Sequence, residues 1–160
     1  GYVYSTPQVP DFLTGREFLN FFIDINRSKI TNLKSIDEYF DLVGIEPEDR
    51  NRLLKDYSHG MKNKVMMLVH IIFNPKILLL DEPLTSFDVV AAAQMKQLLK
   101  DISKEHILIF STHIMELALD LCDEIILLTH GELEKIDRQG EDRDMFEDMI
   151  ISKLKGEDDE

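Results

Sequence analysis

The segment that most constrains the fold is 77–83, in which four apolar residues precede Asp81, Glu82 and Pro83. An apolar run without polar alternation is typical of a strand covered on both faces, as in the centre of a parallel sheet. The two carboxylates would then stand at the carboxyl end of the strand, where open α/β sheets bind ligands and metals. Neighbouring residues of a strand point to opposite sides, so one carboxylate can serve a metal while the other faces a reacting water. The alternative is a strand end with two solvated acids.

Composition limits the class of protein. The chain has 160 residues, of which 44% are hydrophobic and 31% charged, as expected for one soluble globular domain. The single cysteine excludes an internal disulfide and fits a reducing compartment. A net charge of −13 argues against a partner held by nucleic-acid phosphates. Apolar runs are far shorter than the roughly 18 residues that span a bilayer. A start at glycine rather than methionine suggests a fragment or a processed chain.

Residues 14–56 are expected to form an all-helical unit. Thr14 with Glu17, and Ser35 with Glu38, have the spacing of capping boxes, and Pro47 begins a third short helix that runs through Leu54. The expected inward faces of the first two helices are Phe18, Phe22 and Ile25, and Ile36, Phe40 and Val43. An unbroken helical stretch of this kind suggests a subdomain inserted into an α/β fold.

The remaining chain reads as alternating helices and strands. Ser58 is the expected N-cap of a long helix whose glycine-containing first turn suits a phosphate, although most helices of this kind are structural. A second buried strand at 107–110 runs into His113, which places this histidine at the same sheet edge as Asp81 and Glu82. A structural helix cap is the commoner role for a lone histidine. A third strand at 124–129, an antiparallel return at 132–136 at the sheet edge and an amphipathic helix at 142–155 follow.

Four motifs in this order define a resemblance. The segments 57–62 (YSHGMK), 77–83 (ILLLDEP), 84–88 (LTSFD) and 111–113 (STH) resemble the signature, Walker B, D-loop and switch histidine of the ATP-binding cassette (ABC) ATPases. The family's signature is usually written LSGGQ, and the Met61 and Lys62 ending looks like the variant of exporter-type subunits in two-component bacterial systems. The implied fold is an α/β, P-loop NTPase-like parallel sheet with helices on both faces and an inserted helical subdomain, without the N-terminal part of that fold.

The resemblance also implies a division of the chain. Residues 1–13 would be a strand end and the Q-loop region, and 14–76 the helical subdomain with the signature motif and its helix. Residues 77–155 would be the C-terminal part of the ATPase core, and 156–160 a disordered acidic tail.

Two departures from the family pattern stand out. Ser5 occupies the position of the Q-loop glutamine, and Gln8 lies three residues later, so either Gln8 serves through a shifted loop or the contact is absent. No G-x-x-x-x-G-K-[ST] phosphate loop occurs in the 160 residues. The chain therefore resembles the C-terminal portion of such an ATPase.

The catalytic roles follow from the resemblance. Glu82 would polarise the attacking water as general base, and His113 would contact the γ-phosphate of ATP. Asp81 would order Mg²⁺, the implied metal cofactor, through water. Because phosphoryl transfer depends mainly on positioning and charge stabilisation, these groups suffice once the phosphates are held.

The binding roles involve a second subunit. Asp88 would link the two sites of a head-to-tail dimer. The opposite subunit's nucleotide would face four signature residues: Ser58, His59, Gly60 and Met61. The helical subdomain would dock on a membrane-spanning partner.

The resulting hypothesis is the ATP-hydrolysing subunit of an ABC exporter, cytoplasmic and peripheral at the cytoplasmic face of the cell membrane. One alternative is a soluble ABC ATPase that acts on another machine. The other is a non-catalytic docking or regulatory remnant, because the phosphate loop is missing from the sequence.

We expect the 160-residue chain alone to bind Mg-ATP weakly and not to hydrolyse it. The missing loop would supply most of the phosphate cradle and one magnesium ligand. Isothermal titration calorimetry with Mg-ATP measures the affinity, and micromolar binding would contradict the expectation.

Overall fold

The computed structural model describes residues 1–85, 87–136 and 143–155. The chain divides into two compact units, Gly1–Ser111 and Thr112–Glu160. Among the residues described, no helix is both long enough and apolar enough to cross a membrane. The acidic tail predicted at 156–160 lies outside the described residues.

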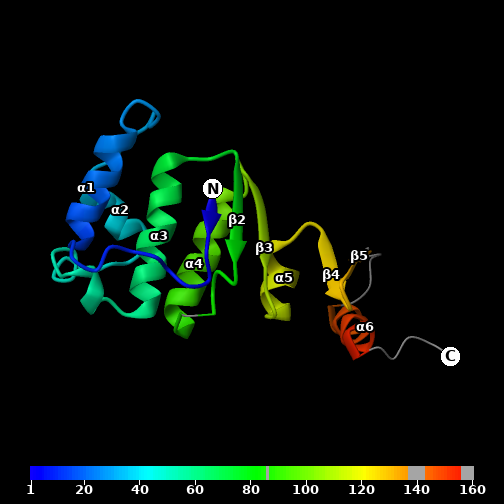
Figure 1. The fold of residues 1–160 in the computed structure, drawn as a ribbon. Helices are drawn as coiled ribbons and strands as arrows, with labels where there is room; N and C mark the ends of the chain where they lie inside the picture. The colour runs from blue at the N-terminus through cyan, green and yellow to red at the C-terminus, as the bar shows by residue number, and fades with distance from the viewer. Residues whose placement is uncertain (86, 137–142, 156–160) are drawn as a thin grey trace. The chain divides into compact units, whose positions relative to one another are not determined.

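The first unit is built on a parallel sheet. Its strands lie in the order β1 (Tyr2–Val3), β2 (Ile77–Asp81) and β3 (Ile107–Ser111). Val3 pairs with Leu80, and Asp81 pairs with Ser111. The predicted strand therefore ends, as expected, at the carboxyl edge of a parallel sheet (Figure 1).

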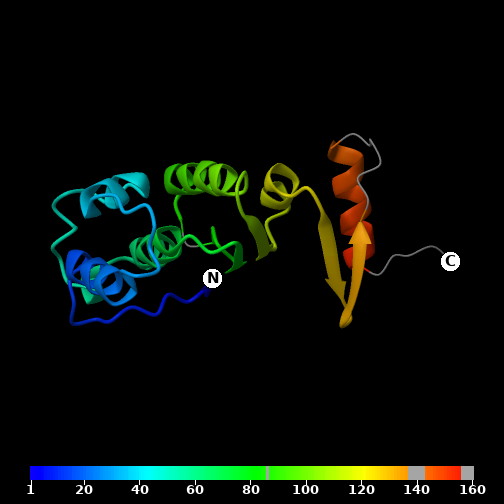
Figure 2. The ribbon, with the colours of Figure 1, turned by 90° about the horizontal axis from the view of Figure 1, so that it is seen from above.

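Two helices cover one face of this sheet. Figures 1 and 2 show α3 (His59–Phe73) and α4 (Val89–Ile102) on the same side of the strands. Leu78 and Leu80 are buried, whereas Ile77 is 48% exposed and Leu79 36%. Ile107 and Ile109 on β3 are exposed as well. Because side chains alternate along a strand, the described residues cover one face of β2 and leave the other open, which differs from the expected cover on both faces.

Both predicted capping boxes are present in the helical part of the first unit. Helix α1 (Gly15–Asn26) begins after Thr14, and α2 (Ile36–Leu42) begins after Ser35. In each box the N-cap hydroxyl accepts the N3 backbone N–H, and the N3 glutamate accepts the N-cap N–H at 2.8 Å. These bonds satisfy donors that a helix start would otherwise leave unpaired.

Two details of the helical prediction are wrong. Helix α1 buries Leu19 and Ile23, whereas Ile25 is 63% exposed, so its inward face is displaced from the predicted one. The helix expected from Pro47 is instead a series of turns followed by a short 3-10 helix, Leu54–Asp56. The Leu54 N–H bonds to the Leu13 carbonyl at 2.8 Å, so pairing with a distant segment replaces local helical bonding.

Arg50 is the polar centre of this helical part. Its side chain is buried, donates to the Ile45 carbonyl at 3.0 Å and lies 5.6 Å from the centre of the Phe40 ring. It forms ion pairs with Asp37 and Asp41, and Asp37 also pairs with Arg16. One guanidinium therefore ties the turns after α2 to α2 itself.

The second unit contains a two-stranded sheet and two helices. They are α5 (Met115–Leu121), β4 (Ile125–Thr129), β5 (Glu132–Ile136) and α6 (Arg143–Lys155). The antiparallel pairing of β4 with β5 confirms the predicted return. Its predicted place at the edge of the parallel sheet is wrong, because in the described residues β4 and β5 form a two-stranded sheet of their own. The hydrophobic core of the second unit contains Leu119, Leu127, Ile136, Phe146 and Ile150.

The Asp37 ion pairs make stability depend on pH. Hydrogen bonds from Arg16 and Arg50 lower the pKa of Asp37 to about 2 from its usual 3.8. Its stabilising effect is therefore complete above the usual value and is lost as the pH falls through about 2. We expect Asp37→Asn to be less stable than wild type at pH 5, with a difference that shrinks toward pH 2.

Urea unfolding of both proteins at low ionic strength, in steps from pH 5 to pH 2, measures that difference. Asp24→Asn, which removes another carboxylate from the same helical part, is the matched control. A stability difference between Asp37→Asn and wild type that stays constant over this range would contradict the assignment.

Candidate functional site

The candidate site lies at the carboxyl edge of the three-stranded sheet. Parallel pairing brings Asp81 of β2 opposite Ser111 of β3, and the Ser111 hydroxyl donates to Asp81 Oδ1 at 2.7 Å. Ser5 follows β1, and its hydroxyl and backbone N–H lie near enough to Asp81 to lower the pKa of that carboxyl. The sheet thus surrounds one carboxylate with donors from both neighbouring strands.

These donors change the acidity of Asp81. The pKa of its carboxyl is lowered chiefly by the Ser111 hydroxyl, then by the Ser5 hydroxyl and the Ser5 N–H, against a desolvation effect that raises it. Each of these bonds favours the charged form. Asp81 is therefore held as a carboxylate at neutral pH.

Glu82 has an uncommon backbone conformation. Its φ of 48° is in the left-handed region, which residues other than glycine seldom adopt. The Glu82 N–H bonds to the Ser111 carbonyl at 3.2 Å and to the Ser111 hydroxyl at 3.3 Å, and the Thr85 hydroxyl donates to the Glu82 carbonyl at 2.9 Å. Its Oε2 atom is buried. Both peptide groups that flank this residue are therefore fixed by hydrogen bonds.

The start of α3 is tied to the same edge. Ser58 is the N-cap, as predicted, and its hydroxyl accepts the Met61 N–H at 3.2 Å. His59 Nε2 lies 3.3 Å from the Ser5 carbonyl oxygen, and Lys62 forms an ion pair with Asp11 at 3.4 Å. Ser5 therefore contacts both the end of β2 and the first turn of α3.

Tyr57, the residue that precedes the Ser58 cap, is held by contacts of its own side chain. Its ring is buried, and its hydroxyl donates to the Asp49 carbonyl at 2.8 Å. The hydroxyl also lies so close to Gly15 that a side chain at position 15 would displace it. Burial raises the pKa of Tyr57 to about 12, so the phenol keeps its proton. The close approach of Gly15 thus joins the start of α1 to the start of α3.

Three further predicted site residues are exposed. Asp88 is the exposed N-cap of α4, and its Oδ1 accepts the N–H groups of Val90 and Ala91 at 3.0 and 2.9 Å. Gln8 is exposed in the segment after β1. His113 is exposed and belongs to the second unit, so its approach to Asp81 and Glu82 stays a prediction.

The oxygen atoms at the sheet edge are suitable ligands for a Mg²⁺ ion that is bound together with a nucleotide. No group of three or more His, Cys, Asp and Glu side chains suited to a metal occurs in the described part of the chain. Magnesium does not require one, because it commonly takes one or two carboxylates together with waters and substrate phosphates. Asp81, with its carboxylate kept charged, is the protein group that would hold it.

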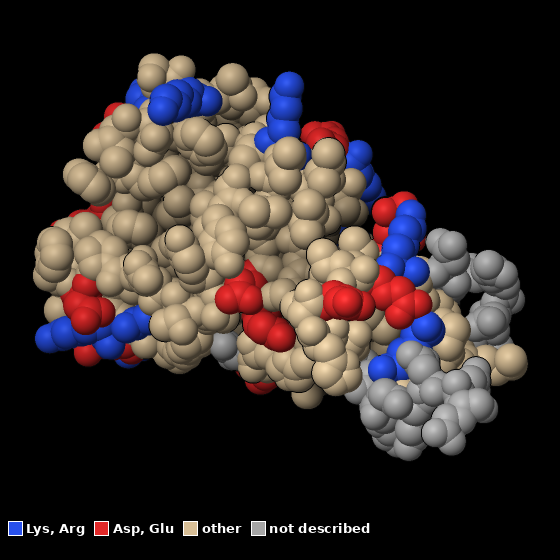
Figure 3. All heavy atoms as spheres, turned by 45° about the vertical axis from the view of Figure 1, so that its right-hand side comes forward, with Lys and Arg blue, Asp and Glu red and all other residues tan. Residues whose placement is uncertain are grey.

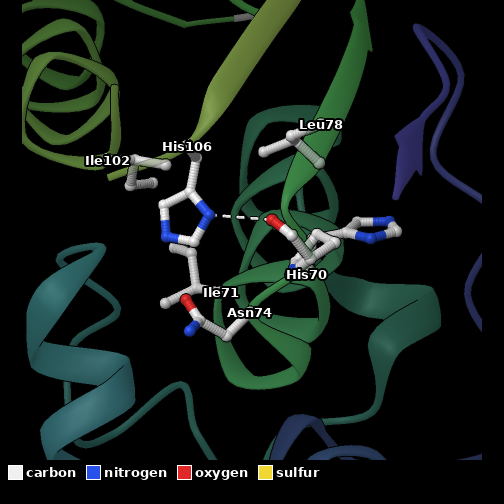
Figure 4. A pocket seen from close by; sticks show the side chains of 7 residues that line it. His70, Ile71, Asn74, Leu78, Ile102 and His106 are labelled. Atoms are coloured by element: carbon white, nitrogen blue, oxygen red, sulfur yellow. Dashed lines mark hydrogen bonds between the residues drawn. The ribbon is translucent and has the colours of Figure 1, made fainter. Parts of the chain in front are cut away.

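Two hollows described in the first unit lie elsewhere. A cavity of about 40 Å³ lies beyond the amino ends of β2 and β3, where His106 Nδ1 is 2.8 Å from the Pro75 carbonyl oxygen (Figure 4). It has room for about one water molecule. A second hollow, of about 330 Å³, is lined by Asp41 of α2 and Asp101 of α4, whose carboxylates would repel phosphate. Neither fits a nucleotide.

Comparison with known proteins identifies the family. The family model described as "ABC transporter" matches residues 1–85, more than half of the chain. The chain belongs to the ABC transporter family, and the resemblance inferred from the four motifs is confirmed. Similar curated proteins include the spermidine/putrescine import ATP-binding protein PotA of Mycoplasmopsis synoviae, 32% identical over 142 residues. The uncharacterized ABC transporter ATP-binding protein YxlF of Bacillus subtilis is 28% identical over 134 residues.

Coverage of these proteins is partial. The matches span 88% and 83% of this chain but only 31% of PotA and 45% of YxlF. Among solved structures, a dimeric post-hydrolysis state of the ATP-binding cassette MJ0796 with ADP and Pi has a TM-score of 0.68 at 23% identity. That match covers 86% of this chain and 62% of the other. The ATP-binding subunit of an ABC transporter gives 0.70 at 20% identity, covering 94% and 67%. The predicted fold class is confirmed.

Sequence reasoning missed part of the site. Ser111 was considered only as part of a motif that ends in His113. Ser5 was considered only as the residue that stands in the position of the Q-loop glutamine. The register of two parallel strands could have identified Ser111, because equal numbers of residues separate Ile77 from Asp81 and Ile107 from Ser111.

Proposed function

We propose that this chain is part of the ATP-binding and ATP-hydrolysing subunit of an ABC exporter. The observation that carries the proposal is the cluster of Ser5, Asp81, Glu82 and Ser111 at one sheet edge, with the α3 N-terminus bonded to it through Ser5. This cluster brings together the charged carboxylate of Asp81, the carboxylate of Glu82, whose backbone is fixed, and the start of α3, which is suited to a phosphate.

The proposed mechanism assigns a different task to each carboxylate. Asp81 would hold the Mg²⁺ of Mg-ATP, and the metal would supply charge neutralisation on the phosphates. Glu82 accepts the proton of the attacking water as general base, and His113 contacts the γ-phosphate. Of the two residues considered for the Q-loop contact, Ser5 is favoured over Gln8 because Ser5 lowers the pKa of Asp81. Catalysis then rests on positioning and charge stabilisation.

The proposed partner is a second ATPase subunit in a head-to-tail dimer. The dimeric post-hydrolysis state of the similar cassette MJ0796 supports this arrangement. The signature residues of one subunit, 58–61, would face the nucleotide of the other, and Asp88 would link the two sites. A nucleic-acid partner is not supported, because the net charge is −13 and the basic side chains in Figure 3 are interspersed with acidic ones.

The exporter assignment is drawn from the ending of the signature motif. The Met61 and Lys62 ending of the signature favours an exporter-type subunit, although the similar protein PotA is described as an import protein. The helical subdomain would dock on a membrane-spanning subunit from the cytoplasmic side.

Glu82→Gln in the full-length protein tests the general base. The change keeps the size of the side chain but removes its basicity, so we expect hydrolysis to fall by about 10²–10⁴-fold while ATP binding persists. Steady-state phosphate release and nucleotide binding are the measurements, and Glu105→Gln is the matched control. Hydrolysis at the wild-type rate would assign the base elsewhere.

Ser58→Arg tests the signature assignment. Ser58→Ala alone would lower stability by about 1 kcal/mol if the residue were only a helix cap. In the proposed role, arginine would block the partner's nucleotide, so ATP-dependent dimerisation should be abolished while binding to the single subunit persists.

Sedimentation with ATP in the Glu82→Gln background measures this dimer. Ser35→Arg, at the exposed N-cap of α2, places the same side chain at another helix start and controls for local destabilisation. A Ser58→Arg dimer as stable as that of the Glu82→Gln parent would overturn the signature assignment.

A further inference from the structure

The Ser111 hydroxyl makes two bonds to the two proposed catalytic carboxylate residues. It donates to Asp81 Oδ1 at 2.7 Å and accepts the Glu82 N–H at 3.3 Å. From these contacts we infer that Ser111 is a positioning residue that orients Asp81 and holds the backbone of Glu82. The inference rests on the proposed function, since it assigns a further residue to the same site.

The local backbone explains why Glu82 needs such support. Its φ of 48° is uncommon for a residue with a side chain, and the following proline restricts it further. This conformation turns the chain sharply out of β2 and so determines where the Glu82 carboxylate points. The hydroxyl and the carbonyl of Ser111 both bind the N–H group at this turn. Ser111 therefore stabilises the conformation that aims the general base.

The chemistry of a hydroxyl fits both tasks at once. A serine hydroxyl has one donor and two acceptor positions, so it can donate to a carboxylate while it accepts an N–H. The side chain is exposed, so packing does not explain the residue type. The pairing of Asp81 with Ser111 in the parallel register places the hydroxyl between the two residues. Alanine or valine at this position could make neither bond.

The most discriminating test compares threonine with valine at position 111. Ser111→Thr and Ser111→Val add side chains of nearly the same shape, both suited to a strand, and differ in whether a hydroxyl is present. Ser111→Ala is the second hydroxyl-free variant. Ser103→Ala removes an exposed hydroxyl that bonds to the Lys100 carbonyl at 3.0 Å after α4, and serves as the matched control.

The first measurement requires neither nucleotide nor metal. Amide hydrogen exchange of Glu82, followed by NMR in the nucleotide-free full-length protein, reports how strongly this N–H is bonded, and the bond to the Ser111 carbonyl is common to all the variants. We expect exchange about 3- to 10-fold faster in Ser111→Val and Ser111→Ala, the range for the loss of one hydrogen bond. Ser111→Thr and Ser103→Ala should exchange like wild type.

The second measurement is the Mg²⁺ dependence of ATP hydrolysis. Loss of the Asp81 bond should raise the Mg²⁺ concentration for half-maximal activity and lower kcat in Ser111→Val. Ser111→Thr should restore both. A general loss of stability would not by itself change the metal requirement of the molecules that remain folded.

The outcomes distinguish the inference from the proposed function. If the valine and threonine variants agree in Glu82 exchange and in Mg²⁺ dependence, the positioning role of Ser111 is overturned. If Glu82→Gln and Asp81→Asn hydrolyse ATP at the wild-type rate, the proposed function fails, whatever the exchange rates show. Faster exchange together with a raised Mg²⁺ requirement in Ser111→Val, both reversed in Ser111→Thr, supports the inference.

Discussion

The parallel pairing of β2 with β3 is the constraint on which the candidate site depends. It aligns Asp81 with Ser111, and this alignment places a hydroxyl within bonding distance of a carboxylate and of the next peptide N–H. A shift of one residue would turn the side chains of one strand to the opposite face. The buried contacts of Leu78 and Leu80 oppose such a shift, so packing on one face of the sheet determines the chemistry at its edge.

The helical part is connected to that edge by specific polar contacts. Arg50 joins the turns after α2 to Asp37 and Asp41 of that helix. Tyr57, just before α3, lies close to Gly15 and donates a hydrogen bond to the Asp49 carbonyl, so it connects the same turns to the start of α3. From there His59 contacts the Ser5 carbonyl, and Ser5 lowers the pKa of Asp81. A displacement of the helical part would therefore be transmitted to the carboxylates through these few polar contacts.

Local sequence signals predicted the elements well where the interactions are local. The boxes at Thr14 and Ser35, the Ser58 cap and the β2 strand were all correct because each depends on residues within one or two turns. The helix expected from Pro47 failed because the Leu54 N–H bonds to Leu13, far away in sequence. The role of Ser111 escaped for the same reason, since it depends on pairing with a strand 30 residues earlier. The approach of His113 to the acids remains a prediction from sheet topology.

The structural and functional interpretations of Ser58 do not compete for the same atoms. As a helix cap, its hydroxyl accepts one N–H from Met61 through an oxygen lone pair. The hydroxyl proton is not consumed by that bond, and a serine oxygen keeps a second acceptor position. In the proposed role this proton would point to a phosphate oxygen at a helix end whose dipole already favours an anion. One side chain can therefore stabilise its own helix and bind a partner's nucleotide, which is why removing the cap and blocking the surface require different substitutions.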